Sequence, residues 1–289
     1  MYTDKQGRNW YKVGLHIHTT NSDGARSPEE AALIYKNAGF DAIAITDHWQ
    51  YHKEDEINGL KIISGCEYNI GGGDSAEGVM HIVGIGMKRE PQLTRENTRQ
   101  EVVDAINKTG GMAVLAHPAW SLNTIKDAKD LSGIAVTEIY NSVSDVGESS
   151  RPYSGYFVDV LANDGIFYNL IATDDTHYYD GSDETKSYIM VNAVSDSAED
   201  ILKAVSDGNI YASQGPKLYV QRVDDKIIVD CSECVKIDFL SNIVWDDGKI
   251  IRGTNLTHAE YEVKDFIKWV RVEACDSNGN YAWSNIIRI

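Results

Sequence analysis

Short apolar segments recur through residue 215 of this chain, and several of them end in histidine or an acidic residue. The candidate strands are Val13–His18, Ala42–Asp47, Lys61–Glu67, Val79–Ile85, Met112–His117, Ile134–Ile139 and Ile166–Thr173. Helical patterns between them cover Pro28–Asn37, Glu96–Thr109, Tyr153–Asn163 and Ala198–Asp207. Alternating strands and helices are typical of a parallel α/β domain, and this many strand candidates favour a barrel over an open sheet.

The pattern changes after residue 215, where short strand-like segments are divided by turn residues. These segments are LYVQRV, KIIVDC, VKIDFL, KIIRG, WVRVEA and WSNIIRI. The DSNGN turn before the last of them contains an Asn-Gly hairpin signal. We therefore predict two domains, an α/β barrel over residues 1–215 and a small antiparallel β-sandwich over residues 216–289.

Charge and hydropathy limit the partners that this chain can have. The formal net charge of −17 disfavours a long nucleic acid, because an acidic surface repels a polyanion. No apolar run is long enough for a membrane-spanning helix, and the first residues, MYTDKQGRNWYK, lack the apolar core of a secretory signal. We expect a cytoplasmic protein with no membrane partner. The four cysteines do not resemble a disulfide framework, and Cys231 and Cys234 are interpreted as ordinary strand residues or a structural pair.

Histidines carry the chemical signal. Six of the eight fall at or just beyond the ends of predicted strands, together with acidic residues. They are His16, His18, His48, His81, His117 and His177, accompanied by Asp23, Asp47, Glu67, Asp174 and Asp175. One such histidine is usually a hydrogen-bonded structural residue. Six of them converge at one mouth of a barrel, and side chains two residues apart on a strand point to the same side. We predict a cluster of divalent cations, with imidazole and carboxylate ligands that suit zinc, manganese or iron.

The order of the motifs resembles that of a known family. HIHTTNSDG, TDH, a strand-end Glu, H-x-V-G, AHP and D-x-H resemble the motifs of the PHP (polymerase and histidinol phosphatase) family. This resemblance spans roughly residues 10–215. It implies a metal-dependent phosphoesterase on a distorted, seven-stranded, TIM-like (β/α) barrel. The β-rich segment that follows resembles the carbaryl-hydrolase-like branch of the superfamily.

The resemblance also implies a set of two or three metal ions. His16, His18, Glu67 and Asp175 would hold one ion, and Glu67 would bridge to a second ion bound by His81 and His117. Asp23, His48 and His177 would hold a third, although some family members have histidine where this chain has Asp23. Glu67, Asp175 and His177 are the expected catalytic residues, and His177 has a second possible role as the acid for the leaving group.

Several neighbouring residues each have two interpretations. Asp47 precedes a ligand and fits the orientation of an imidazole, whereas Asp174 fits either that role or a structural one. Arg151 can grip a phosphate and Asn141 can contact the substrate, but a surface arginine and a turn asparagine are equally ordinary. Trp49, Trp120 and Tyr178 follow the motifs and can stack on a substrate ring, although aromatic residues in such places more often only pack.

These observations predict a phosphoesterase that cleaves a small phosphorylated substrate, such as a nucleotide, by attack of a metal-bound hydroxide. A hydrolase of carboxylic esters or carbamates is the alternative, because the same metal centre can attack a carbonyl carbon. A binding module without activity is disfavoured, because no expected ligand is missing from the motifs.

Overall fold

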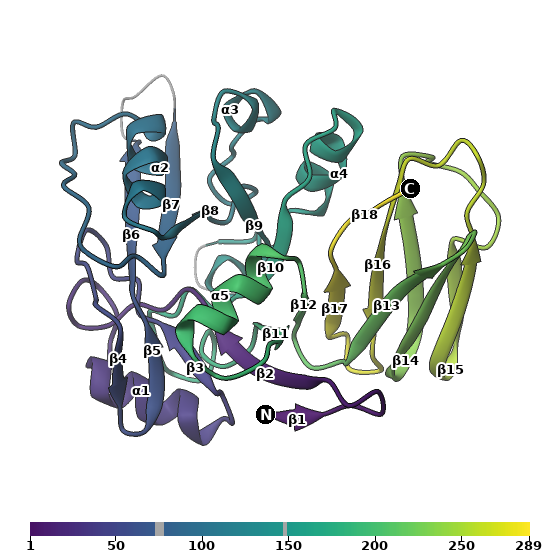
Figure 1. Ribbon diagram of the computed structural model, residues 1–289, viewed down its shortest axis with the longest axis horizontal. Coiled ribbons are helices and arrows are strands. Elements are labelled where there is room, and N and C mark those ends of the chain that lie inside the picture. The colour runs from purple at the N-terminus through teal and green to yellow at the C-terminus, as the bar shows by residue number, and fades with distance from the viewer. Residues whose placement is uncertain (73–77, 147–148) are drawn as a thin grey trace.

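The computed structural model describes residues 1–72, 78–146 and 149–289. Over these residues the chain has a mixed α/β fold with two hydrogen-bonded sheets and few helices. Figure 1 shows the strands after residue 215 gathered at one end of the molecule, with most of the helices toward the other end. Neither sheet closes on itself over the described residues, so the closed form of the distorted seven-stranded barrel that we expected is not observed.

The smaller sheet has five strands in sequence order. They are β6 (Gly65–Gly71), β7 (Val79–Ile85), β8 (Met112–Leu115), β9 (Ile134–Asn141) and β10 (Asn169–Thr173). β8, β9 and β10 are parallel, but β7 is antiparallel to both of its neighbours. The expectation of an all-parallel barrel is therefore wrong at β7. The segment between β6 and β7 is too short for the crossover that a parallel pair requires.

The larger sheet contains the remaining strands of residues 1–215. They are β1 (Tyr2–Thr3), β2 (Asn9–Gly14), β3 (Ala42–Ala44), β4 (Asp55–Ile57), β5 (Leu60–Ile63), β11 (Tyr188–Asn192) and β12 (Ile210–Ser213). β2 and β3 end sooner than the apolar pattern predicts. After the ends of β2 and β3, the two segments stay hydrogen-bonded through a side chain. The Ile17 amide donates to Thr46 Oγ1 over 3.0 Å, and the Thr46 amide donates to the Ile17 carbonyl.

Three of the helices begin at capping boxes that the sequence contains. Ser27, Thr98 and Thr124 cap α1 (Pro28–Asn37), α2 (Arg99–Lys108) and α3 (Ile125–Lys129). The predicted helix over Pro28–Asn37 is confirmed at both ends. The remaining helices are the 3-10 turn η1 (Val143–Asp145), α4 (Gly155–Asn163) and α5 (Ala198–Ser206). The short α3 was not predicted.

The strands after residue 215 are antiparallel, as expected. They are β13 (Leu218–Val223), β14 (Lys226–Ser241), β15 (Ile250–Glu262), β16 (Trp269–Cys275), β17 (Tyr281–Ser284) and β18 (Ile287–Arg288). β17 also pairs with β12, so these strands are joined by hydrogen bonds to the larger sheet, and their packing as a sandwich stays a prediction. The domain boundary at residue 215 stays a prediction.

A buried ionic contact joins α4 to the strands of this last part. The guanidinium of Arg271, on β16, is fully buried and donates to both carboxylate oxygens of Asp159 on α4, over 2.6 and 2.9 Å. It also pairs with Glu273, and Trp269 Nε1 donates to Asn163 Oδ1 over 3.1 Å. These contacts pack α4 against β16.

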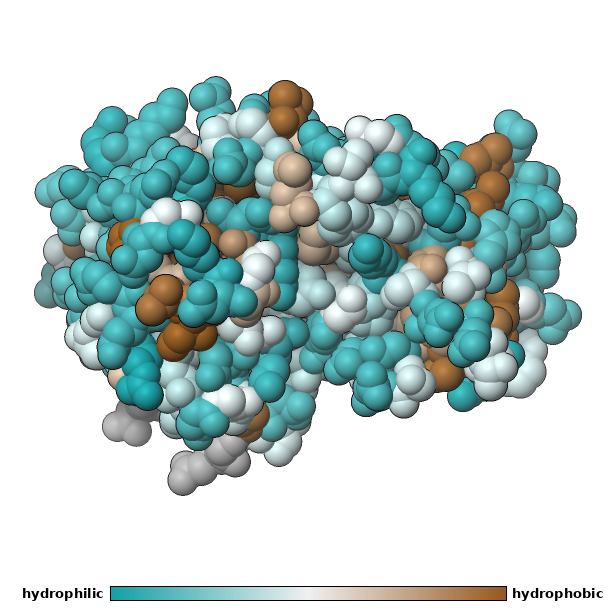
Figure 2. Space-filling view, turned by 90° about the horizontal axis from the view of Figure 1, so that it is seen from below, coloured by the Kyte–Doolittle hydropathy of each residue, from teal (hydrophilic) through white to brown (hydrophobic). Residues whose placement is uncertain are grey.

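The outer surface is mostly polar on the face that Figure 2 shows, where hydrophobic residues form small, separate patches. Among the described helices there is none with the length and apolar character needed to cross a membrane.

Candidate metal centre

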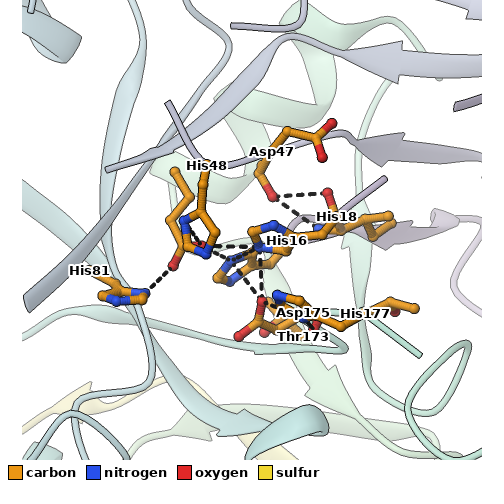
Figure 3. A network of polar contacts seen from close by, with 12 residues as sticks. His16, His18, Asp47, His48, His81, Thr173, Asp175 and His177 are labelled. Carbon is orange, nitrogen blue, oxygen red and sulfur yellow. Dashed lines mark hydrogen bonds and ion pairs between the residues drawn. The ribbon is translucent and has the colours of Figure 1, made fainter. Parts of the chain in front are cut away.

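Four buried side chains from distant segments meet at the first donor group. His16 and His18 follow β2, Glu67 lies on β6 and Asp175 follows β10. His16 Nε2 lies 3.2 Å from Glu67 Oε2 and 3.1 Å from Asp175 Oδ1. His18 Nε2 lies 3.0 Å from each of the same two oxygens. Figure 3 shows both imidazoles turned toward Asp175. The donor atoms lie within 4.8 Å of one another, so this group can hold a cation.

Three buried atoms in this region have no hydrogen-bond partner among the described residues. They are Glu67 Oε2, Asp175 Oδ1 and His48 Nδ1. Leaving buried polar atoms unpaired is costly, and here all three face nitrogen or oxygen donors that also bind metals. Divalent cations would use these free lone pairs. The residues therefore fit metal ions, and the purely nitrogen and oxygen donor set suits zinc, manganese or iron.

Glu67 faces two groups of ligands with its two oxygens. Oε2 faces His16 and His18, and it lies 3.1 Å from His48 Nδ1. Oε1 lies 2.7 Å from His81 Nδ1 and 3.4 Å from His117 Nε2. This is the position that a bridging carboxylate requires, and the bridging role itself stays a prediction.

A third group of donors lies nearer the solvent and includes Asp23, whose side chain is 52% exposed. Asp23 Oδ1 lies 3.3 Å from His18 Nδ1 and 3.5 Å from His177 Nε2, and Asp23 Oδ2 lies 3.7 Å from His48 Nε2. His18 therefore takes part in two groups, with Nε2 toward the first and Nδ1 toward this one. The resemblance had assigned His18 to the first ion alone.

The charges in the cluster are strongly coupled. Burial disfavours the charged form of His16, but Asp175, Glu67 and Glu138 outweigh it and raise the pKa of His16 well above its usual value. Burial likewise opposes ionisation of Glu67, yet His16 and His81 hold the pKa of Glu67 well below its usual range. The carboxylates are thus ionised, which is the form that binds a cation.

His48 behaves differently from its neighbours. Burial lowers the pKa of His48 to about 4, although Glu67 acts in the opposite direction. A neutral imidazole keeps a free lone pair, so His48 is prepared to act as a ligand near neutral pH.

Sequence reasoning missed Glu138, which lies buried on β9 behind the first group. Its Oε1 lies 2.7 Å from His16 Nδ1, and its Oε2 accepts the backbone amide of His117 over 2.8 Å. This contact directs His16 Nε2 toward Glu67 and Asp175, as an outer carboxylate does for a metal-binding histidine. The signal available was one acidic residue inside the apolar segment IAVTEIYN.

The two residues proposed to contact substrate lie in different surroundings. Asn141 is fully buried and donates to Glu138 Oε2 over 2.8 Å and to Asp175 Oδ2 over 3.1 Å, so it links two carboxylates of the site. Arg151 is exposed, and its backbone amide donates to the Ser144 carbonyl over 3.0 Å. Substrate contact by either residue stays a prediction.

Asp47 and Asp174 organise the backbone around the site. Asp47 accepts the amide and the hydroxyl of Thr19, each over 2.7 Å, and the hydroxyl of Ser22, and thereby fixes the turn that carries Asp23. Asp174 accepts the amides of Lys186 and Ser187, and burial raises its pKa to about 7. Both carboxylates therefore position the surrounding chain, and among the described residues neither is hydrogen-bonded to an imidazole.

The backbone departs from regular geometry at the ligands. His117 and Asp175 have positive φ angles of 24° and 53°, an uncommon conformation for residues other than glycine. His81 lies inside β7, not at a strand end as expected. Because β7 runs antiparallel to its neighbours, its first residues reach the mouth where the parallel strands end.

A cavity of about 670 Å³ opens over the donor groups. Asp23, His48, Glu67, His81, His117, Asp175 and His177 contribute to its lining. Trp120 and Tyr178 also line it, whereas Trp49 is not among the lining residues and donates to Asn69 Oδ1 over 2.6 Å. The cavity therefore gives a small molecule direct access to the clustered donors.

Comparison with known proteins shows what this chain is similar to in sequence. Residues 14–115 match the model of the PHP domain family. An uncharacterized protein of Methanocaldococcus jannaschii is 27% identical over 45% of this chain and 83% of its own length.

Two solved structures are similar in shape. A two-domain protein from Bacteroides vulgatus, described as containing a predicted PHP-like metal-dependent phosphoesterase, is 15% identical with a TM-score of 0.57. The match covers 100% of this chain and 97% of that one, and it shows the fold alone. A lesion-specific endonuclease from Pyrococcus furiosus is 17% identical over 69% of this chain and 56% of its own, and its TM-score of 0.45 is too low to bear on function.

Proposed function

We propose that this chain is a metal-dependent phosphoesterase that hydrolyses a small phosphorylated substrate, because residues 14–115 match the model of the PHP domain family. The observation that carries this proposal is the position of Glu67 between two sets of histidines, with its buried Oε2 lying 3.0 Å from His18 Nε2 and its Oε1 lying 2.7 Å from His81 Nδ1. Oε2 has no hydrogen bond of regular geometry among the described residues, so its lone pairs are available to a cation.

The side chains would have different roles in such a site. His16, His18, Glu67 and Asp175 would hold one cation, and Glu67 would share a second with His81 and His117. Asp23, His48 and His177 would hold a third with His18 beside them. Bound cations would supply Lewis acidity and a more acidic water. Glu138 and Asn141 keep His16 and Asp175 in place, so little reorganisation is needed when substrate binds.

His177 has the position expected of an acid for the leaving group. Its side chain is 23% exposed at the cavity, and Asp23 and Asp175 raise its pKa against the effect of burial. We propose that it acts mainly as a ligand of the outer group, because its Nδ1 lies 2.6 Å from the Asp175 carbonyl and its Nε2 faces Asp23.

One observation favours a second candidate, a hydrolase of carboxylic esters or carbamates. No lysine or arginine is among the described residues that line the cavity. Phosphate sites commonly add such a cation, whereas a neutral ester does not need one.

A substrate panel separates the two candidates. After loading with zinc or manganese, the protein should release phosphate from a phosphomonoester or nucleotide at least about tenfold faster than it cleaves a naphthyl ester or a carbamate. Initial rates at equal substrate concentration give the comparison. Turnover of the carboxylic esters without any phosphate release across the panel would reverse the proposal.

Removing a ligand of the outer group should leave the inner groups intact. We expect His177→Ala to retain at least one tightly bound metal ion and to lose on the order of tenfold in turnover. Elemental analysis of the purified variant and its rate give both values. His258→Ala is the control, because His258 is exposed on β15 and pairs with Asp230. If His177→Ala lost all of its metal while His258→Ala kept it, metal binding by the inner groups would depend on the outer group, and this prediction would be wrong.

A further inference from the structure

The walls of the cavity differ in character from its metal-binding floor. Apart from the clustered histidines and carboxylates, the described lining consists of apolar, aromatic and serine side chains. Trp120, Val143, Val146 and Tyr178 are the larger of these. A substrate whose phosphate lies on the floor must therefore place the rest of its body against uncharged surface.

Among the described residues that line the cavity, no lysine or arginine supplies compensating positive charge. The chain has a formal net charge of −17. A further anionic group on the substrate would lose hydration at these walls without gaining a cationic partner.

Trp120 is placed to contact the organic group directly. Its ring centroid lies 5.0 Å from that of His117 and 5.5 Å from that of His81, so it adjoins two proposed ligands. The side chain is still 37% exposed, and Tyr178, which follows His177, is 51% exposed. Two partly exposed aromatic residues beside metal ligands leave ring faces free for a substrate.

We infer that the substrate is a phosphate ester whose organic group is uncharged and contains a ring, and that Trp120 selects it. The inference rests on the proposed phosphoesterase function and narrows it. A simple nucleoside monophosphate or an aryl phosphate belongs to this class. Bisphosphates, polyphosphates and oligonucleotides do not, because they place additional negative charge against the walls.

Three inert phosphonates test the inference by binding, without turnover. Methylphosphonate has no ring, phenylphosphonate adds a ring, and 4-carboxyphenylphosphonate adds a distant negative charge to that ring. We expect calorimetry on the metal-loaded protein to show phenylphosphonate binding about tenfold more tightly than each of the other two. Equal or tighter binding of the carboxylated compound would overturn the inference.

Variants assign the effect to the walls. Trp120→Ala should remove most of the advantage of phenylphosphonate over methylphosphonate while leaving methylphosphonate binding and metal content unchanged. Trp245→Ala is the matched control, because Trp245 is 88% exposed in the β14–β15 connection. Val146→Lys should improve binding of 4-carboxyphenylphosphonate severalfold. Loss of methylphosphonate binding in Trp120→Ala would mean that Trp120 only supports the ligands, and the selecting role would then be wrong.

The phosphonate experiment and the substrate panel test different claims, so a negative result in one does not decide the other. Discrimination among phosphonates tests the walls, whereas phosphate release tests the reaction. Phosphatase activity with no preference among the phosphonates would overturn this inference alone. Discrimination without release of phosphate from any ester would overturn the proposed function.

Discussion

Glu67→Gln should lower turnover by on the order of a hundredfold or more and should reduce metal content in two donor groups at once. The substitution keeps the shape of the side chain but removes the negative charge that faces His16 and His18 through Oε2 and His81 through Oε1. It also replaces one acceptor with an amide nitrogen that cannot bind a cation. Rate and elemental analysis on the same preparation measure both effects.

A matched control separates the loss of the site from general damage. Glu262→Gln makes the same chemical change at an exposed position on β15, and it should leave rate, metal content and melting temperature unchanged. The bridging position would be wrong if Glu67→Gln kept the metal and the rate of the unaltered protein. Loss of metal from only one group would assign Glu67 to a single ion.

The donor set was predictable because its members lie in short contiguous motifs. His16 with His18, and Asp175 with His177, are two residues apart, and His48, Glu67 and His117 close apolar segments. The structure brings these side chains together, and the donor groups include eight of the nine predicted ligands. The ninth, His117, contacts Glu67 and Asp175 at 3.4 and 3.6 Å.

Residues behind the ligands could not be found in the same way. Glu138 is a single carboxylate in an apolar strand, and its partner His16 is 122 positions away in sequence. Local sequence therefore contains nothing that pairs them. In the sequence, Asn141 has the pattern of an ordinary turn residue. Only the structure shows that it donates to both Glu138 and Asp175.

The direction of the strands and the closure of the sheets also could not be predicted from the hydrophobic pattern. Apolar runs indicate where strands lie but not how they run, so the antiparallel β7 was missed. Isolated bridges such as Ile17 to Thr176 and His48 to Glu67 replace regular ladders near the site. The ligands there require positive φ angles and side-chain hydrogen bonds that hydrophobic periodicity does not encode.

Arg271 provides the second large effect, on stability. Its guanidinium is fully buried, while the side chains of Asp159 and Glu273 are 24% and 9% exposed. Asp159 belongs to α4, which follows the strand that carries Glu138, and Arg271 belongs to β16 in the last part of the chain. The contact therefore ties the two parts together, and removing the cation would leave two carboxylates without their partner.

We expect Arg271→Ala to lower the free energy of unfolding by about 3–5 kcal/mol, as for other broken buried ion pairs. Urea denaturation followed by circular dichroism measures the change. Arg222→Ala, at an exposed position on β13, should stay within about 0.5 kcal/mol of the unaltered protein. The triple variant Arg271→Met, Asp159→Asn, Glu273→Gln removes every charge of the contact and should recover much of the loss. If Arg271→Ala were as stable as Arg222→Ala, the ionic contact would not hold α4 against β16, and packing around Trp269 would have to do so.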